Sequence, residues 1–381
     1  MIRTLTLLAL FCCVQPQRSA NIMTGAEQMN EVVRKLTGKR VALVVNHTSL
    51  VGKKHLTDTL LRRGIDIKKI FAPEHGFRGE AEAGETVKDG RDTQTGLPVI
   101  SLYGNLKKPT PEMLQDVDIV VFDIQDVGAR FYTYISTMHY VMEACAENGK
   151  SLLILDRPNP NGHYTDGPIL EPEFKSFVGM HPIPIVHGMT VGELARMING
   201  EGWLEGGRIC ALEIIPVKNW THNTPWSLPV KPSPNLPNNQ AVTLYPSLCL
   251  FEGTAISVGR GTPTPFQVIG HPDLKDMPYQ FTPTDIQGMA TNPPHKDKIC
   301  YGLDLRTVPV KAALDLSYLL KMYKAFPEKD KFFTGYFEKL AGTKRLREQI
   351  QQGMTEEQIK KSWEEGLQQF RRKRSKYLLY P

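Results

Sequence analysis

The segment PEHGFRGEAEAGE, which begins at Pro73, carries the densest set of reactive side chains and directly follows the apolar run KKIFA. It holds four Glu, one Arg and one His around three Gly. Hydrolysis of a glycosidic bond needs one group that protonates the leaving oxygen and a second that activates water, attacks or stabilises positive charge. Glu74 is the best candidate for the acid, because a residue that directly follows a strand is held in place by a rigid scaffold.

The other polar residues of this segment have simpler explanations. We expect Glu80, Glu82 and Glu85 to be solvated side chains of a surface loop. Glu74 or His75 also has an alternative role, in which the side chain only fixes the loop through hydrogen bonds to backbone N–H groups.

Polar residues also follow three other apolar runs. Asn46 follows RVALVV, Asp123 follows DIVVF, and DRPN follows SLLIL. In an open parallel sheet, ligands bind outside the carboxyl ends of the strands, so the sequence predicts a polar site at that edge. The substrate-binding candidates there are Asn46, His75, Arg78, Asp123, Gln125, Arg130, Tyr132 and Asn159.

Several other kinds of site are not indicated. The chain has no G-x-G-x-x-G after its first predicted strand and no G-x-x-x-x-G-K-[ST], so no phosphate-binding loop is expected. Ser136 lacks the G-x-S-x-G elbow of a serine hydrolase. His47, His75 and Asp123 lack the spacing of helix-borne metal ligands. We therefore expect neither a metal ion nor a cofactor.

Between residues 21 and 220, short β-branched runs alternate with helix-like segments. This alternation predicts an α/β fold with a parallel sheet that is covered by helices on both faces. The strand-like runs are RVALVVNH, KKIFAP, LPVISLYG, DIVVFDIQD, KSLLILDRP and ICALEIIPV. The helix-like segments are MTGAEQMNEVVRKL, LTDTLLRRG, YISTMHYVMEACAENG and TVGELARMING.

The composition and pattern of the sequence change after residue 220. THNTPWSLPVKPSPNLPNN is rich in Pro and Asn, short strand-like runs follow, and the last segments are helical. A chain of 381 residues favours two domains. We predict a catalytic α/β domain over residues 21–220 and a smaller α+β domain over residues 221–381.

Residues 1–20 have the pattern of a secretory signal peptide. Arg3 precedes the apolar run LTLLALFCCV, which is too short to cross a bilayer, and a small residue, Ala20, ends the segment. We expect cleavage there and export to a periplasm or to the cell surface. Lipidation of Cys12 or Cys13 is the less favoured alternative, because Phe11 stands where a small residue normally precedes the modified Cys.

Composition excludes some partners. The formal net charge is only +6, and the basic run RRKRSK near the end is best explained as a solvated helix end. Because nucleic-acid binding favours a basic face with interleaved aromatic residues, we expect no nucleic-acid partner. The four Cys beyond residue 20 are widely spaced, which indicates buried free thiols.

Seven motifs together resemble one family, the NamZ-like exo-β-N-acetylmuramidases. The motifs are PEHGFRGEAEAGE, TGLPVISLYG, DIQDVGARFYTY, DRPNPNG, HGMTVGELA, SPNLP and YPSLCLFEGTAISVGRGT. The resemblance implies a Rossmann-like N-terminal domain, a smaller C-terminal domain and a catalytic cleft between them. It also implies release of N-acetylmuramic acid from the non-reducing ends of peptidoglycan fragments.

The resemblance identifies Glu74 with the family's PEHG glutamate. For the second catalytic carboxylate the sequence offers Glu171 and Glu252, and we favour Glu171. Muramic acid carries a lactyl carboxylate, which a guanidinium can bind through two parallel hydrogen bonds, so Arg130 and Arg260 are candidates for reading it.

Two other functions stay open at this point. One is a non-catalytic protein that binds muropeptides or other carbohydrates on the same scaffold, since fold does not determine function. The other, a nucleotide-dependent transferase, is less favoured because the phosphate loop is absent. We expect a sugar derived from peptidoglycan as the partner and no stable membrane insertion after the leader is removed. The sequence does not indicate an oligomeric state.

Overall fold

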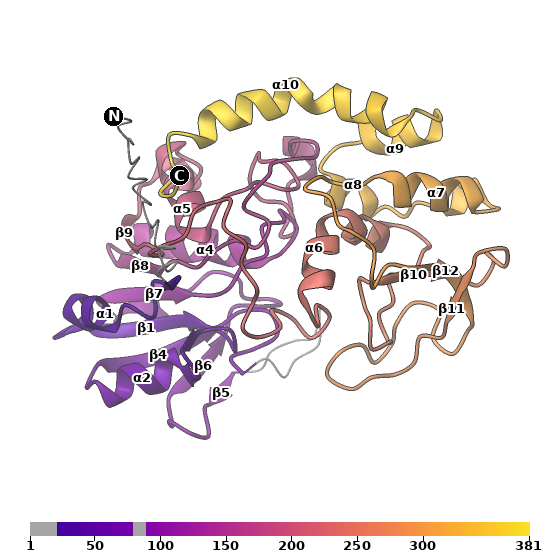
Figure 1. Ribbon diagram of the computed structural model, residues 1–381. Coiled ribbons are helices and arrows are strands. Elements are labelled where there is room, and N and C mark those ends of the chain that lie inside the picture. Colours follow the sequence, from indigo (N-terminus) through magenta and orange to yellow (C-terminus); the bar gives the residue numbers. More distant parts are fainter. Residues whose placement is uncertain (1–20, 79–88) are drawn as a thin grey trace, which may run out of the picture.

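The computed structural model describes residues 21–78 and 89–381 (Figure 1). The predicted signal peptide, together with Glu80, Glu82 and Glu85, lies outside these described residues. None of the helices in the described ranges combines the length and the apolar character that a membrane crossing requires.

A seven-stranded sheet forms the centre of the N-terminal part, in the order β5-β6-β4-β1-β7-β8-β9. All neighbouring strands are parallel except β5 and β6. Counted along the chain, the parallel strands follow the order 3-2-1-4-5-6 of the doubly wound dinucleotide-binding fold. The strands are β1 Arg40–Val45, β4 Asp66–Ala72, β5 Gly90–Arg91, β6 Pro98–Ser101, β7 Ile119–Asp123, β8 Ser151–Leu155 and β9 Ala211–Ile215.

Helices cover both faces of this sheet, as the alternating sequence pattern predicts. Leu43 of β1 belongs to a core cluster with α1 and α2, whereas its neighbour Val44 belongs to a second cluster with α4 and α5. Consecutive side chains of a strand point to opposite faces, so strands buried on both sides read as continuous apolar runs. The helices of this part are α1 Met29–Leu36, α2 Leu56–Arg62, α3 Pro111–Leu114, α4 Tyr134–Glu147 and α5 Val191–Gly200, and β2 Leu50–Val51 pairs with β3 Lys54–His55.

The C-terminal part combines helices with a small antiparallel sheet of order β10-β12-β11 (Figure 1). Its strands are β10 Val268–His271, β11 Tyr279–Phe281 and β12 Cys300–Asp304. Its helices are α6 Asn239–Leu248, α7 Ser317–Ala325, α8 Phe337–Ala341, α9 Arg345–Gln351 and α10 Glu356–Arg374. The four Cys of the described chain are buried and free, as predicted.

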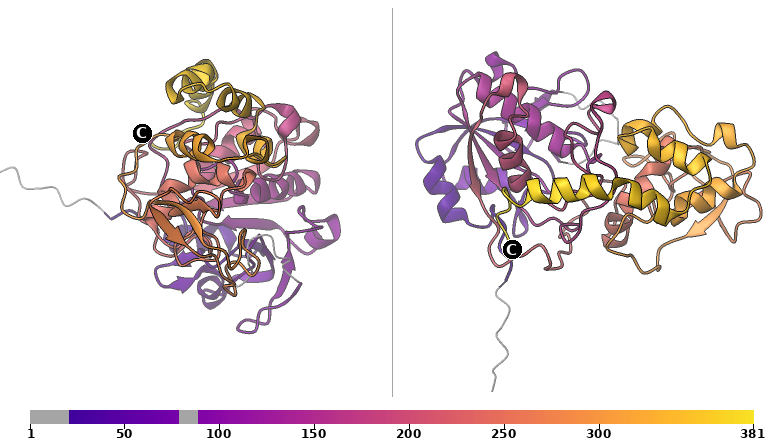
Figure 2. Two further views of the ribbon diagram at one scale, coloured as in Figure 1. Left: turned by 90° about the vertical axis from the view of Figure 1, so that its right-hand side faces the viewer. Right: turned by 90° about the horizontal axis from the view of Figure 1, so that it is seen from above.

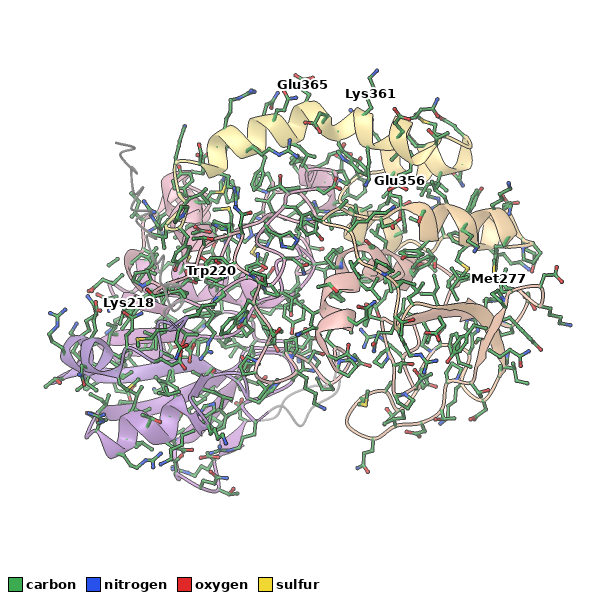
Figure 3. The ribbon with its side chains drawn as sticks, viewed as in Figure 1. Lys218, Trp220, Met277, Glu356, Lys361 and Glu365 are labelled. Carbon is green, nitrogen blue, oxygen red and sulfur yellow. The ribbon has the colours of Figure 1, made fainter. Side chains whose placement is uncertain are left out.

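Helix α10 runs from the C-terminal part back over the N-terminal part (Figure 2). Thr355 and Gln358 begin it with a capping box, and Lys361 and Glu365 lie on its exposed side (Figure 3). Its last turn is docked rather than free, because Arg374 donates to the carbonyl of Gly188. The tail that follows is anchored by Tyr380, whose hydroxyl lies 2.6 Å from Asp156 Oδ2. The end of the chain therefore connects the two parts of the molecule.

Candidate active site

A cavity of about 540 Å³ opens between the carboxyl end of β4 and the C-terminal part of the chain. Its volume falls within the usual range for small-molecule sites, which combine apolar walls with a few placed polar groups. The main polar or ionisable residues of its wall are Glu74, His75, Tyr103, Tyr132, Thr133, Ser233, Asn235, Glu252, Arg260 and Tyr336.

A turn at the end of β4 presents Glu74 to this cavity. The N–H of Gly76 donates to the carbonyl of Pro73 at 3.0 Å, which closes the turn. His75 and Gly76 both have positive φ angles, of 69° and 76°. A non-glycine residue with positive φ is uncommon and tends to occur at functional sites. The strained turn lets the chain reverse direction immediately after Glu74.

Hydrogen bonds hold the Glu74 side chain in place. Thr133 Oγ1 donates to Glu74 Oε2 at 2.6 Å. The phenol of Tyr103 also bonds to this carboxylate, and burial, followed by the charge of Glu74 and this hydrogen bond, raises the pKa of Tyr103 well above its usual range. Tyr103 thus stays a donor at neutral pH. Glu74 therefore faces the cavity with a fixed orientation.

The opposite wall, from the C-terminal part, contributes Glu252 and Arg260. Glu252 lies in the 3₁₀ helix Cys249–Gly253, and its Oε1 lies 2.5 Å from Arg260 Nε. The exposed fractions of the two side chains are 24% and 20%. Burial lowers the pKa of Arg260, but the charge of Glu252 outweighs burial and raises it overall, so the guanidinium is always charged. Within the described chain, Nε is the only nitrogen of Arg260 that makes a hydrogen bond, which leaves its terminal edge for a ligand.

Tyr336 lies at the mouth of the cavity and connects the two walls. It precedes α8 and is 39% exposed. Burial raises the pKa of its phenol above the usual range, and the nearby Cys249, Glu252 and Glu74 raise it further. Tyr336 therefore lines the cavity together with both carboxylates.

The structure brings five of the sequence-predicted residues together at the cavity. They are Glu74, His75, Tyr132, Glu252 and Arg260. The ring of Tyr132 forms part of the wall, while its hydroxyl donates to the carbonyl of Pro232 at 2.8 Å. His75 is nearly buried, with Nε2 3.2 Å from Ser233 Oγ.

Four predicted residues at the ends of β1, β7 and β8 lie away from this cavity. Asn46, Asp123, Gln125 and Asn159 are all 3% exposed or less and bond within the protein. Asp123 accepts from Arg157 Nε and Nη2 at 2.6 and 2.9 Å.

The Pro-rich segment 221–238 explains this burial. Trp226 Nε1 of this segment lies 3.3 Å from Gln125 Oε1, and the carbonyl of Lys231 lies 2.8 Å from His47 Nε2. The segment covers the edge between β1 and β7, where a dinucleotide binds in the doubly wound fold. The polar edge of the sheet is thus filled by the chain itself, and the open site lies at β4.

Two predicted arginines, Arg130 and Arg78, are also placed elsewhere. Arg130 is fully buried, and four backbone carbonyls accept from its guanidinium, two of them from Leu340 and Ala341 at the end of α8. Burial lowers its pKa to about 9. Arg78 makes two hydrogen bonds of 2.9 Å to Asp92. Neither guanidinium lines the cavity.

Glu171, the favoured second carboxylate, lies in a separate depression beside α10. Thr343 Oγ1 donates to its Oε1 at 2.9 Å, and Arg345 Nε lies 3.8 Å from the same oxygen. In the described chain, Glu252 is therefore the acidic residue that shares the cavity with Glu74.

Several residues of the cavity were not singled out from the sequence as site residues. Ser233 and Asn235 belong to the SPNLP motif, which was recognised without a role for either residue. Thr133 directly follows Tyr132, which was predicted as a site residue. No sequence motif marks Tyr336, because only the fold brings the start of α8 to the end of β4.

A larger cavity of about 990 Å³ lies elsewhere, between α10 and the segment 162–166. Its charged groups are largely paired: Arg371 Nη1 lies 3.0 Å from Glu364, and Lys360 lies 3.5 Å from Asp166. None of the sequence-predicted site residues lines it. We therefore assign the chemistry to the smaller cavity.

Comparisons with known proteins agree with these features. Residues 41–240 match the N-terminal family model of the exo-beta-N-acetylmuramidase NamZ, and residues 243–380 match its C-terminal model. The chain is 42% identical over 389 aligned residues to the peptidoglycan beta-N-acetylmuramidase NamZ of Bacillus subtilis (strain 168), covering 96% of this chain and 93% of that protein.

Two solved structures share the fold. Both are DUF1343 family proteins of Bacteroides fragilis NCTC 9343. One is 48% identical with a TM-score of 0.89 and covers 95% of this chain and 99% of its own. The other is 32% identical with a TM-score of 0.80 and covers 94% of this chain and 99% of its own. The chain therefore belongs to the NamZ exo-β-N-acetylmuramidase family.

Proposed function

We propose that this chain is an exo-acting glycosidase that releases N-acetylmuramic acid from the non-reducing ends of peptidoglycan fragments. The observation that carries this proposal is the pairing of Glu74 with Glu252 in one cavity, beside an arginine with an open edge. The name of the Bacillus subtilis relative supports the same substrate class.

In this proposal Glu74 is the general acid. A glycosidase must protonate the oxygen of the leaving sugar as the bond to the anomeric carbon breaks. Thr133 and Tyr103 hold the Glu74 carboxyl group toward the cavity, so its proton is delivered from a fixed position.

Glu252 is the second carboxylate, in place of Glu171. Its ion pair with Arg260 holds the side chain in place at the cavity, which suits a group that faces the positive charge developing at the anomeric carbon. Glu171 is hydrogen-bonded to Thr343 outside the cavity and has no part in this mechanism.

Arg260 reads the feature that distinguishes muramic acid from glucosamine. Its Nε is taken by Glu252, which orients the guanidinium, and its terminal nitrogens remain for the lactyl carboxylate of the sugar. A charge-assisted, two-point contact of this kind gives both affinity and geometric specificity. Arg130 has no corresponding role, because backbone carbonyls already accept from both of its terminal nitrogens.

The two parts of the chain act in this proposal as two domains with the site between them. Glu74 and Thr133 come from the N-terminal part, and Glu252, Arg260 and Tyr336 come from the C-terminal part. We also propose that residues 1–20 direct export to a periplasm or the cell surface. Mass spectrometry of the protein isolated from its host should then find an N-terminus near Asn21.

The test is hydrolysis of a chromogenic β-N-acetylmuramide, with the matching N-acetylglucosaminide as control. We expect release of the chromophore from the muramide alone. Glu74→Gln should lower kcat about 100-fold or more, as loss of a general acid does. Glu252→Gln should also lower kcat strongly, whereas the isosteric Glu173→Gln, at an exposed position of the 3₁₀ helix Pro172–Phe174, should not.

The outcomes separate the candidate functions. Equal kcat values for the wild type and Glu74→Gln would refute the role of Glu74. Binding of N-acetylmuramic acid without hydrolysis of either compound would identify a non-catalytic carbohydrate-binding protein instead.

A further inference from the structure

An apolar turn projects into the wall of the cavity. Ser176 and Gly179 pair through two backbone hydrogen bonds of 2.8 and 3.1 Å, so Phe177 and Val178 are the central residues of a tight turn. Such positions usually hold Gly, Asn, Asp, Pro or Ser. Phe177 and Val178 are neither buried in the core nor turned to open solvent, and both line the cavity. Val178 also packs against the hydrophobic core, whereas Phe177 belongs to no core cluster of the described residues, so core packing does not explain why position 177 is apolar.

Aromatic and basic side chains support the ring of Phe177. Tyr140 of α4 is nearly parallel to it, with an interplanar angle of 15° and ring centroids 6.4 Å apart. Tyr103 lies 6.1 Å away between ring centroids, and the ammonium of Lys107 lies 4.8 Å from the ring centroid. Phe177 is thus held as a fixed surface and not as a loose side chain.

The residues that line the cavity include an aromatic group and a charged group. Tyr103 bonds to Glu74 and contacts Phe177. Glu252 and Arg260 form their ion pair on the opposite wall of the same cavity. Glu74 therefore shares one cavity with an aromatic group at Phe177 and a charged group at Glu252.

This arrangement has a consequence for the substrate. The acid of a glycosidase lies at the bond between the two sugars, so the sugar that stays and the sugar that leaves occupy opposite sides of it. If Glu252 and Arg260 hold N-acetylmuramic acid, the aromatic group at Phe177 is available for the leaving sugar.

We propose that Phe177 is the platform for the leaving sugar, against which a pyranose of the N-acetylglucosamine class packs its apolar face. This inference rests on the proposed function and adds a specificity-determining residue to it. A flat aromatic face offers a large apolar contact area to a sugar ring.

The experiment compares two substrates that differ only in the leaving group. One is the disaccharide of N-acetylmuramic acid linked β-1,4 to N-acetylglucosamine, and the other is β-N-acetylmuramyl fluoride, whose leaving fluoride is too small to reach Phe177. For Phe177→Ala, kcat/KM should fall about ten-fold on the disaccharide, as loss of one aromatic contact predicts, and stay within about two-fold on the fluoride.

Control variants keep the result clear if Phe177→Ala is poorly folded. Phe177→Tyr retains the ring and should retain activity on the disaccharide. Phe174→Ala, three residues earlier, removes a ring that lines a different depression and should change neither value. Equal losses on both substrates, or no loss on the disaccharide, would overturn the role of Phe177. A wild type that hydrolyses neither compound would overturn the proposed function itself.

Discussion

Two arginine–carboxylate pairs in this protein have the same chemistry but different surroundings. Asp123 and Arg157, at the ends of β7 and β8, are 0% and 3% exposed at their side chains, and two nitrogens of the arginine bond to the aspartate. Glu252 and Arg260 are 24% and 20% exposed, and a single nitrogen of the arginine is used. The first pair fills the edge of the sheet, whereas the second pair leaves hydrogen-bonding capacity for a ligand.

The comparison teaches that a charged residue indicates a binding site when some of its hydrogen-bonding groups have no partner within the protein. Its position at the end of a strand is not sufficient. The covered pair occupies the edge where ligands bind in open α/β sheets. The segment 221–238 covers that edge. The open cavity lies at the end of the neighbouring strand β4, and residues of the C-terminal part form its opposite wall.

The largest effect should come from breaking the covered pair. Asp123→Ala leaves the buried guanidinium of Arg157 without its partner, which should lower the free energy of unfolding by about 3–5 kcal/mol. Urea unfolding followed by circular dichroism measures this. Asp118→Ala, which breaks the exposed pair with Arg40, is the matched control and should shift the urea midpoint much less. Equal shifts for the two variants would show that burial does not distinguish the pairs.

Breaking the open pair should mainly affect activity. Arg260→Ala should lower kcat/KM on the muramide about 100-fold, or about 2.7 kcal/mol, through loss of the contact with the lactyl carboxylate. Its loss of unfolding free energy should be smaller than that of Asp123→Ala. Arg260→Lys keeps the charge but not the planar fork, so an intermediate kcat/KM is expected. An Arg260→Ala variant with wild-type preference for muramide over glucosaminide would contradict this role.

The covered region should also respond to pH through Asp126. Burial raises the pKa of this carboxyl from 3.8 to about 7, so the folded protein keeps a proton that the unfolded chain releases near pH 4. Stability should therefore fall as pH rises from about 4 to 7. Asp126→Asn lacks this pH-dependent contribution to stability. The difference in the free energy of unfolding between the wild type and the variant should therefore change by more than about 1 kcal/mol over that range. Parallel pH profiles would contradict a protonated Asp126.

The smallest effect is expected at Glu171. Its carboxylate bonds to Thr343 outside the cavity, so Glu171→Gln should leave kcat/KM within about two-fold of the wild type. Steady-state kinetics on the muramide, run beside Glu252→Gln, decides between the two candidate carboxylates. A large loss at Glu171 with little change at Glu252 would reverse our assignment.

The sequence was sufficient for the architecture of the sheet. Its six parallel strands coincide with the six predicted apolar runs to within a few residues at the ends. The reason is that strands buried on both faces carry a strong apolar signal. The two-residue strands such as β5 were not predicted, since so short an element has no periodicity. Thr190 and Thr355 were recognised as helix caps, and both form capping boxes.

The site was less predictable for a physical reason. The end of a strand can be read from local sequence, so Glu74 after β4 was found. Whether another segment covers that end depends on long-range packing, so the sequence could not show that Gln125 contacts Trp226 of segment 221–238 and is buried. The same limit applies to Arg130, whose four carbonyl partners come from segments far apart in the chain.

The most direct test of the central claim is a crystal structure of Glu74→Gln with the N-acetylmuramic acid–N-acetylglucosamine disaccharide bound. The account predicts that the glycosidic oxygen lies within hydrogen-bond distance of residue 74, that Glu252 faces the anomeric carbon, and that the lactyl carboxylate contacts the terminal nitrogens of Arg260. A disaccharide bound outside this cavity, or with its glycosidic oxygen far from residue 74, would contradict it.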